Sequence, residues 1–325
     1  MVLAEAFHVS VIVPVLDEEA TLAPLVEALR GVAGAGLGGR AIEIVLIDDG
    51  SRDRSWTEMR RLAAAHGEVR CARLRRNFGK SAALAVGTEM ARGEIVVTMD
   101  ADLQDDPEEL PRFLAKLDEG YDLVSGWKQN RDDPLGKTLP SRFFNAVTRR
   151  MTRLDLHDFN CGYKAARRRV YQDISLYGEL HRYIPVLANS LGYRVTEIPV
   201  KHHARRHGVS KYGLERYARG FLDLLTVLTI TRFGQRPGHL FGGLGILVGL
   251  VGFAALAYLT LLWLGGEAIG TRPLLLFGVM AELLSAQLLT LGMLAELILH
   301  RTRQGSMLSL VAETEPVRLA PERAA

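Results

Sequence analysis

The sequence predicts an α/β domain with a mostly parallel sheet, followed by two membrane-spanning helices. Two observations carry this prediction. Between residues 9 and 125, short apolar runs alternate with segments whose apolar residues recur at helical spacing, which is typical of strands joined by helices that cover both faces of a sheet. Nearer the C-terminus, residues 240–264 and 273–299 form two long apolar segments.

The elements of the α/β domain follow from local patterns in chain order. The run VSVIVP predicts a first strand at 9–14, and helical apolar spacing predicts a helix at 21–30. The glycine-rich stretch 31–39 is expected to be a loop. Further strands are expected at 42–47, 69–74, 95–99 and 122–125, and further helices at 53–66, 80–91 and 107–119.

After Gly126 the pattern becomes less regular. We expect a polar loop at 128–137, a helix at 139–151, an edge strand at 163–166 and a strand at 194–200. Residues 201–212 form a basic loop without periodicity. Residues 214–233 combine apolar and basic residues at helical spacing directly before an apolar segment, which favours a helix in the membrane interface over an ordinary surface helix.

The first apolar segment has 25 residues without a charge and would span about 37 Å as a helix, against about 30 Å for a bilayer core. The second contains Glu282, Gln287 and Glu296. A role of Glu282 in packing is favoured over a functional role, in which its partner would be Gln287 or a residue of another subunit in a homo-oligomer. Two buried core helices are the alternative, which the length and uniform apolarity of the first segment disfavour.

Cations flank the two apolar segments and set the expected orientation. They are concentrated outside the short link between the segments, so the positive-inside rule predicts a multi-pass inner (plasma) membrane protein with both termini cytoplasmic. We expect a catalytic domain at 1–213, an interfacial region at 214–237, the transmembrane pair within 238–302 and a polar tail at 303–325. The flanking cations are Arg232, Arg236, Arg301 and Arg303.

Composition excludes several classes of protein. The chain has 40 Lys and Arg against 37 Asp and Glu, and this net charge of +3 argues against a nucleic-acid partner. Its two cysteines, Cys71 and Cys161, provide neither a disulfide framework nor zinc-ligand spacing. The first ten residues lack the basic-then-apolar order of a signal peptide, so the catalytic part is expected in the cytoplasm.

Acidic side chains follow the strand expected at 95–99. Asp100 and Asp102 stand one residue apart in the run DADLQDDP, where the carboxyl ends of parallel strands form the ligand crevice. Carboxylate oxygens at such a position suit Mg²⁺ or Mn²⁺, which often bridge to substrate phosphates. The alternative is an acidic loop with an Asx turn and a helix that begins at Pro107.

Two other strand ends carry polar residues that would meet Asp100 and Asp102 at one sheet edge. They are PVLDEE after the first strand and DDGS after the second. Carboxylates here can accept hydrogen bonds from a nucleoside. The sequence has no G-x-G-x-x-G after the first strand and no P-loop motif, so a nucleotide diphosphate would be held by a metal and by cations.

The ordered motifs PVLDEE, IDDGS, NFGK and DADLQDDP resemble the family 2 glycosyltransferases with the GT-A fold. The chain is most similar to the polyprenyl-phosphate sugar synthases, such as dolichol-phosphate mannose synthase and bacterial undecaprenyl-phosphate glucosyltransferases. The similarity covers about residues 8–213. It is supported by DFNCGYK at 158–164, GELHRY at 178–183 and HARRHGVSKY at 203–212.

The resemblance implies a role for each matching residue. Asp100, Asp102 and Gln104 would hold the metal, and Arg205 and Lys211 would neutralise phosphates from a flexible loop. The resemblance further implies a nucleotide-binding set, Pro14, Leu16, Glu18, Asp49, Asp100 and Ala101, and an acceptor-phosphate set, Lys128, Lys137 and Ser141.

The resemblance also implies the reaction, which is inverting, metal-dependent hexose transfer from a nucleotide sugar to a polyprenyl phosphate. UDP-glucose is the first expectation for the donor and GDP-mannose the second, with UDP-N-acetylhexosamine and UDP-pentose derivatives as further alternatives. A membrane-tethered transferase with a non-lipid acceptor and a non-enzymatic scaffold are the alternatives. Several residues keep two interpretations: Asn77 and Lys80 as site or helix-capping residues, and Glu179 and His181 as acceptor-orienting or turn-stabilising residues.

Overall fold

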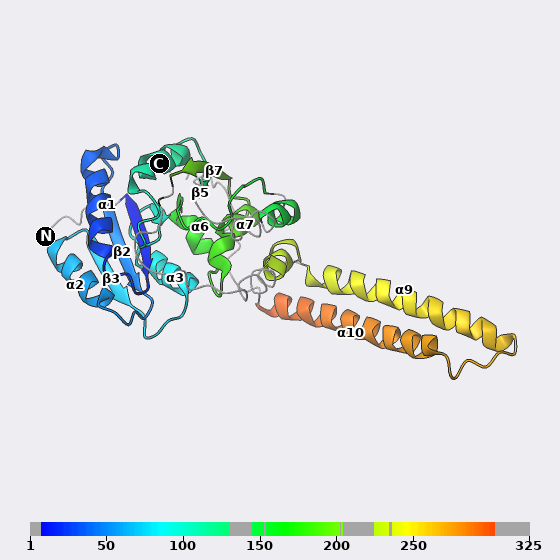
Figure 1. The fold of residues 1–325 in the computed structure, drawn as a ribbon. Helices are drawn as coiled ribbons and strands as arrows, with labels where there is room; N and C mark the ends of the chain where they lie inside the picture. Colours follow the sequence, from blue (N-terminus) through cyan, green and yellow to red (C-terminus); the bar gives the residue numbers. More distant parts are fainter. Residues whose placement is uncertain are drawn as a thin grey trace, which may run out of the picture. The chain divides into compact units, whose positions relative to one another are not determined.

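A computed structural model of the protein describes residues 8–129, 145–152, 154–201, 203, 224–233 and 236–302. The chain divides into two compact units, Met1–Val227 and Leu228–Ala325. The first is an α/β unit and the second contains the two long apolar helices (Figure 1).

The described part of the first unit is built on one sheet of seven strands in the order β3-β2-β1-β4-β6-β5-β7. Neighbouring strands are parallel except around β6, which is antiparallel to both β4 and β5. The predicted mostly parallel sheet is therefore confirmed. The strands are β1 (Val9–Val15), β2 (Ile42–Asp48), β3 (Val69–Arg73), β4 (Ile95–Thr98), β5 (Leu123–Lys128), β6 (Lys164–Arg167) and β7 (Val195–Val200).

The register brings three strand ends to one edge. Val15 at the end of β1 pairs with Asp48 at the end of β2, and Ile12 in β1 pairs with Thr98 at the end of β4. The loops that follow β1, β2 and β4 therefore leave the sheet side by side. This juxtaposition brings the PVLDEE, DDGS and DADLQDDP motifs together, as the sequence predicted.

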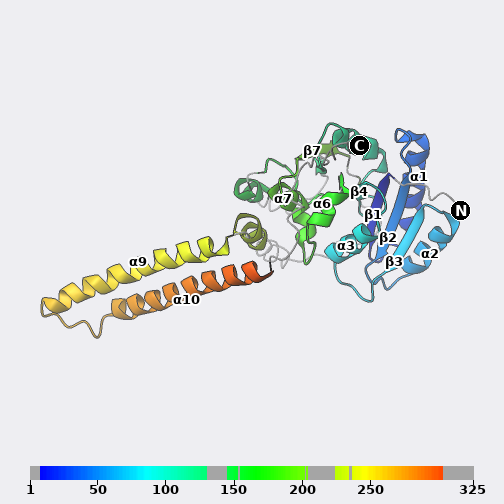
Figure 2. The ribbon, with the colours of Figure 1, turned by 180° about the vertical axis from the view of Figure 1, so that it is seen from behind.

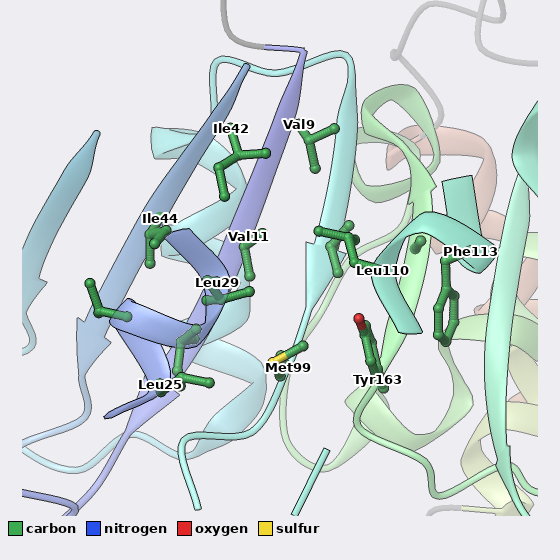
Figure 3. Close-up of a cluster of buried hydrophobic side chains, with 14 of the residues drawn as sticks. Val9, Val11, Leu25, Leu29, Ile42, Ile44, Met99, Leu110, Phe113 and Tyr163 are labelled. Carbon is green, nitrogen blue, oxygen red and sulfur yellow. The ribbon is translucent and has the colours of Figure 1, made fainter. Parts of the chain in front are cut away.

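Helices cover both faces of the sheet (Figures 1 and 2). Odd-numbered residues of β1 enter a core with α1 and α4, shown in Figure 3, where the Phe113 and Tyr163 rings stack with centroids 4.3 Å apart. The helical elements are α1 (Leu22–Gly36), α2 (Ser55–Ala65), α3 (Lys80–Met90), η1 (Pro107–Glu109), α4 (Leu110–Asp118), α6 (Arg168–Asp173), η2 (Leu180–Tyr183) and α7 (Ile184–Ser190).

The other face of β1 is covered by α3. Gly87 of this helix lies so close to the sheet that a Cβ added there would be 2.3 Å from Cγ2 of Ile12. The absence of a side chain at Gly87 thus permits the close approach of α3. This approach matters for the site because the first residue of α3 is Lys80.

Two local predictions were wrong. Residues 31–36 continue α1 instead of forming a loop, and Leu37, which follows the helix, is buried in the core. The strand predicted at the sheet edge from 163–166 is instead the interior strand β6, between β4 and β5.

The second unit contains two helices, α9 (Pro237–Leu264) and α10 (Pro273–Thr302), which lie side by side (Figures 1 and 2). By length and composition both are suited to cross a membrane. The expected interfacial helix lies partly outside the described residues; 224–228 are α-helical and η3 (Thr229–Phe233) is π-helical.

Small residues form the contact between α9 and α10. A Cβ on Gly249 would lie 2.6 Å from Oγ of Ser285, and one on Gly252 would lie 2.9 Å from Cβ of Ala281. The Ser285 hydroxyl donates a hydrogen bond to the carbonyl of Gly245 at 2.8 Å. Such close backbone approach is typical of helix pairs in membranes.

Candidate active site

The loops that follow β1 and β4 each contain a residue with left-handed backbone. Asp17 has φ 55° and Leu103 has φ 59°, the two positive values among described non-glycine residues. Strained backbone of this kind persists where surrounding structure holds it, and it often accompanies function. Asp17 lies within the PVLDEE motif and Leu103 within DADLQDDP, both of which the sequence singled out.

The loops after β1 and β2 are joined by hydrogen bonds. The Asp17 carboxylate accepts a hydrogen bond from the backbone N–H of Arg52 at 2.7 Å, and the Asp17 N–H donates to the Ser51 hydroxyl at 3.0 Å. The backbone N–H of Glu18 donates to the Ser55 hydroxyl at 2.9 Å. These bonds fix the shape of the loop that carries the predicted nucleotide-binding residues Leu16 and Glu18.

Asp49 connects β2 to the N-terminus of α3. Its side chain is buried and accepts hydrogen bonds from the backbone N–H groups of Phe78, at 2.8 Å, and Gly79, at 3.0 Å. Burial raises the pKa of Asp49 despite these bonds. The structure thus shows Asp49 holding the NFGK loop against the end of β2, beside partly exposed Pro14 and Leu16.

Asp100 lies in an ion pair with Lys80, the first residue of α3. Burial acts to raise the pKa of Asp100, but the charges of Lys80 and Lys128 outweigh it and hold that pKa well below its usual range. The Lys80 pKa is raised by Asp100 in spite of burial. Both groups are therefore charged at neutral pH.

Gly162 forms the wall on the other side of Asp100. A Cβ added to Gly162 would lie 2.6 Å from Oδ2 of Asp100. The neighbouring carbonyl is also fixed, because the Gly162 oxygen accepts a hydrogen bond from the Thr98 hydroxyl at 2.8 Å. The Asp100 carboxylate is thus confined between Lys80 and the backbone of the DFNCGYK segment.

Asp102 and Gln104 follow Asp100 in the same loop. Asp102 is buried, and its Oδ1 accepts a hydrogen bond from the Gln104 N–H at 3.3 Å. The Gln104 side-chain amide donates to the carbonyl of His203 at 3.3 Å. Ala101, between the two aspartates, is buried in the core. The loop after β4 is therefore connected to the start of the 203–212 segment.

Lys128 at the end of β5 lies in the same charged region. Its ammonium is 3.1 Å from Oδ1 of Asp105, and both side chains are buried or nearly so. Burial would lower the Lys128 pKa, but Asp105 and other anionic neighbours raise it well above its usual range. Of the predicted acceptor-phosphate set, Lys128 is thus the member whose surroundings are described.

Two further titratable residues border this region. Lys164 of β6 is buried and donates a hydrogen bond to the carbonyl of Cys161, and burial lowers the Lys164 pKa to about 8. Burial and the charge of Lys80 lower the His181 pKa well below its usual value, so the ring is neutral. His181 Nδ1 lies 3.0 Å from the hydroxyl of Ser81 in α3.

The sequence and the structure agree on some site residues and differ on others. Lys137, Ser141, Arg205 and Lys211 lie outside the described residues, and their roles stay predictions. The sequence left Lys80 with two interpretations and assigned no role to Asp105 or Lys164. The sequence did contain one signal for Lys80, which is a cation at the start of the helix that follows β3. Because β3 is parallel to β2, the helix after it begins at the same sheet edge as the other loops.

A divalent metal fits the carboxylates at this edge. Among the described residues, no three His, Cys, Asp or Glu side chains gather as a complete ligand set. Asp100 and Asp102 instead offer an incomplete oxygen set, and Mg²⁺ is commonly bound by one or two carboxylates together with waters and substrate phosphates. The donor set therefore suits a metal that is shared with a phosphate-bearing substrate.

Residues 10–175 match the family model of glycosyl transferase family 2. The chain belongs to this family and is a glycosyltransferase. It is 41% identical over 305 residues to dodecaprenyl-phosphate galacturonate synthase from Rhizobium johnstonii, covering 90% of this chain and 88% of the relative. It is 39% identical over 292 residues to undecaprenyl-phosphate 4-deoxy-4-formamido-L-arabinose transferase from Pseudomonas aeruginosa PAO1, covering 89% and 84%.

Solved structures share the fold at lower sequence identity. Glucosyl-3-phosphoglycerate synthase from Mycobacterium tuberculosis, crystallised with Mn²⁺, UDP and phosphoglyceric acid, aligns with a TM-score of 0.53 and 21% identity, over 69% of this chain and 78% of that chain. Its complex with Mn²⁺ and UDP-glucose aligns with a TM-score of 0.51 and 22% identity, over 69% and 79%. The predicted GT-A fold is confirmed.

Proposed function

We propose that this glycosyltransferase transfers a sugar from a nucleotide sugar to a polyprenyl phosphate and produces a lipid-phosphate-linked sugar. The observation that carries the proposal is similarity over about nine-tenths of the chain to relatives named for polyprenyl-phosphate products or substrates. The similarity extends beyond the sheet and its loops, and the chain has two apolar helices suited to a lipid environment.

The sugar follows from the same relatives. One is named for galacturonate and the others for 4-deoxy-4-formamido-L-arabinose. We therefore place nucleotide-linked galacturonate first and the formamido-arabinose second as donors. UDP-glucose and GDP-mannose, which the sequence analysis favoured, come after them, because neither is named by these relatives.

The chemistry requires no general base on the protein. A phosphate monoester has a second pKa of about 6, so its oxygen is already ionised at neutral pH and can attack the anomeric carbon directly. Direct attack inverts the configuration at that carbon. The work of the enzyme is then to position two phosphate-bearing substrates and to balance their charge.

The residues of the site divide this work. Asp100, Asp102 and Gln104 would hold Mg²⁺ or Mn²⁺, which when bound stabilises the negative charge of the leaving nucleoside diphosphate. Pro14, Leu16, Glu18, Asp49 and Ala101 would line the nucleotide site. Arg205 and Lys211 would neutralise the donor phosphates, while Lys128, Lys137 and Ser141 would bind the acceptor phosphate.

The two apolar helices would place the enzyme in the membrane that contains its acceptor. We propose a multi-pass protein of the inner membrane with the catalytic unit and both termini in the cytoplasm. This orientation rests on the distribution of cations around 240–264 and 273–299. Nucleotide sugars are then available on the side of the catalytic unit.

A donor and acceptor panel tests the proposal. The purified full chain in detergent, with Mg²⁺ or Mn²⁺, is incubated with undecaprenyl phosphate and each nucleotide sugar, and the lipid product is detected by mass. We expect one sugar phosphate adduct, formed fastest from a nucleotide-linked galacturonate. Transfer to soluble sugars but never to the lipid phosphate would overturn the proposal.

Asp102→Asn provides the matched test of the metal site. It keeps the size of the side chain but removes the charge, so we expect transfer to fall by at least 100-fold, on the order of 3 kcal/mol in transition-state stabilisation. Asp118→Asn is the control, because Asp118 forms a surface pair with Arg40 and should leave activity unchanged. Near-normal turnover by Asp102→Asn would contradict the metal assignment.

A further inference from the structure

The ion pair between Lys80 and Asp100 places a cation of the protein on one of the two carboxylates proposed to hold the metal. Lys80 reaches the pair from the N-terminus of α3, and Asp100 directly follows Met99 at the end of the β4 segment. The two side chains are about a third exposed, 28% for Lys80 and 34% for Asp100. The pair is therefore in contact with solvent.

Asp100 has little freedom to leave Lys80. Gly162 also lies against the carboxylate, where a Cβ would approach within 2.6 Å of Oδ2 and 3.0 Å of Oδ1. The backbone N–H of Asp100 lies 3.4 Å from Oδ2 of Asp105, so the start of the loop is held as well. A divalent cation that binds Asp100 must consequently displace or closely approach the Lys80 ammonium.

Lys128, whose charge also acts on Asp100, is itself paired with another carboxylate. Lys128 lies 3.1 Å from Asp105, whose side chain is fully buried. Lys80 is thus the cation assigned to Asp100, while Asp102 is contacted by the Gln104 N–H in the same loop.

Charge repulsion makes this arrangement consequential. A positive unit charge a few ångströms away repels a divalent cation even in water, and the repulsion is stronger near a protein surface, where the charges are screened less. A nucleoside diphosphate would relieve this repulsion, because its oxygens can bind the metal and can also accept hydrogen bonds from the Lys80 ammonium. Metal and nucleotide should then enter together.

We propose that Lys80 is a positioning residue that occupies Asp100 in the donor-free enzyme, so that the divalent cation binds only with the nucleotide and Lys80 then turns to the diphosphate. This inference rests on the proposed metal-dependent transfer from a nucleotide sugar. It assigns to Lys80 a role in the order of binding, beyond capping a helix.

The test measures metal binding separately from catalysis. Free Mn²⁺ is followed by electron paramagnetic resonance while it is titrated with the full chain, without and with UDP. For the unaltered protein we expect Mn²⁺ binding to be at least tenfold tighter with UDP. For Lys80→Met we expect Mn²⁺ alone to bind at least tenfold tighter than to the unaltered protein, and UDP to bind more weakly.

Two control variants keep the result interpretable. Lys80→Arg retains the cation and should restore the dependence of Mn²⁺ binding on UDP. Lys116→Met removes the same charge from a surface pair with Glu119 and should leave both titrations unchanged. Thermal melting of each variant verifies that it is folded, and if Lys80→Met does not fold, Lys80→Gln is titrated in its place.

The outcomes separate this inference from the proposed function. Equal Mn²⁺ affinity of the unaltered protein with and without UDP, or no change in Lys80→Met, overturns the role of Lys80 while leaving metal-dependent transfer intact. Absence of Mn²⁺ binding under every condition, including with UDP, instead overturns the proposed metal site itself.

Discussion

Three described lysines lie at this sheet edge, and Lys164 differs from the other two in the group that its ammonium contacts. Asp100 is paired with Lys80 and Asp105 with Lys128, whereas Lys164 donates to the backbone carbonyl of Cys161. Lys164 is buried, and burial of an ammonium disfavours its charged form. This difference gives Lys164 a measurable effect on stability.

Lys164→Met should change how stability depends on pH. Burial lowers the Lys164 pKa from 10.5 to about 8, so between these values the unfolded chain binds more protons and stability rises with pH. The full difference corresponds to about 3 kcal/mol. We expect the thermal midpoint of the unaltered protein to rise relative to that of Lys164→Met between pH 8 and 10. Parallel pH profiles would contradict the lowered pKa, and Lys116→Met is the control.

A side chain at position 162 should disrupt the site. In Gly162→Ala the new Cβ would meet the Asp100 carboxylate at 2.6 Å, so the carboxylate must shift away from its present position beside Lys80. We expect at least a tenfold loss of UDP affinity by calorimetry, equivalent to about 1.4 kcal/mol. Gly67→Ala, which meets nothing within 4 Å, is the matched control. Equal UDP affinity in both variants would disprove the confinement of Asp100.

The sequence identified the carboxylates of the site better than their partners. Asp100 and Asp102 are visible because they follow an apolar strand directly. Lys80 lies 20 residues earlier in the chain, and its contact with Asp100 depends on how closely α3 approaches the sheet. That approach is set by packing between Gly87 and Ile12, which no local pattern reveals.

Secondary-structure elements were predicted well, while the position of β6 in the sheet was not. Lys164–Arg167 is short and begins and ends with a cation, which is typical of an edge strand. In the structure it lies between β4 and β5 and its first three residues are buried. Strand order depends on long crossovers between elements, so the composition of one strand could not establish it.

The glycines at 31–36 misled the prediction of a loop. Each glycine weakens a helix by only about 1 kcal/mol, and α1 continues through them.

The packing of α9 against α10 predicts different outcomes for two glycines of one helix. A Cβ at Gly252 would already lie 2.9 Å from Cβ of Ala281, so a leucine there must clash with α10. A Cβ at Gly243, which is exposed, has no neighbour within 4 Å. Overpacking of this kind costs about 1–3 kcal/mol. We expect Gly252→Leu to lower the thermal midpoint in detergent micelles by several degrees and Gly243→Leu to leave it nearly unchanged. Similar midpoints for the two variants would argue against this helix contact.

At the scale of the whole molecule, the proposed function requires the second unit to anchor the protein in a membrane. Both α9 and α10 expose many large apolar side chains, such as Leu250, Phe253, Leu283 and Leu297. Such surface is unfavourable in water and favourable in lipid. An anchor of this kind should resist salt, because salt screens charges but does not weaken apolar burial.

Charges placed in the middle of both helices should therefore release the protein, whereas charges at their ends should not. A lysine at the centre of a spanning helix costs about 2.5–3.5 kcal/mol, but near an end its ammonium can reach the interface. We expect Leu250→Lys combined with Leu283→Lys to reduce the fraction of protein retained in alkali-washed membranes. Leu264→Lys combined with Leu274→Lys, which lie at helix ends, should be retained like the unaltered protein. Equal retention of the two double variants, or complete extraction of the unaltered protein by salt alone, would show that α9 and α10 do not span the membrane.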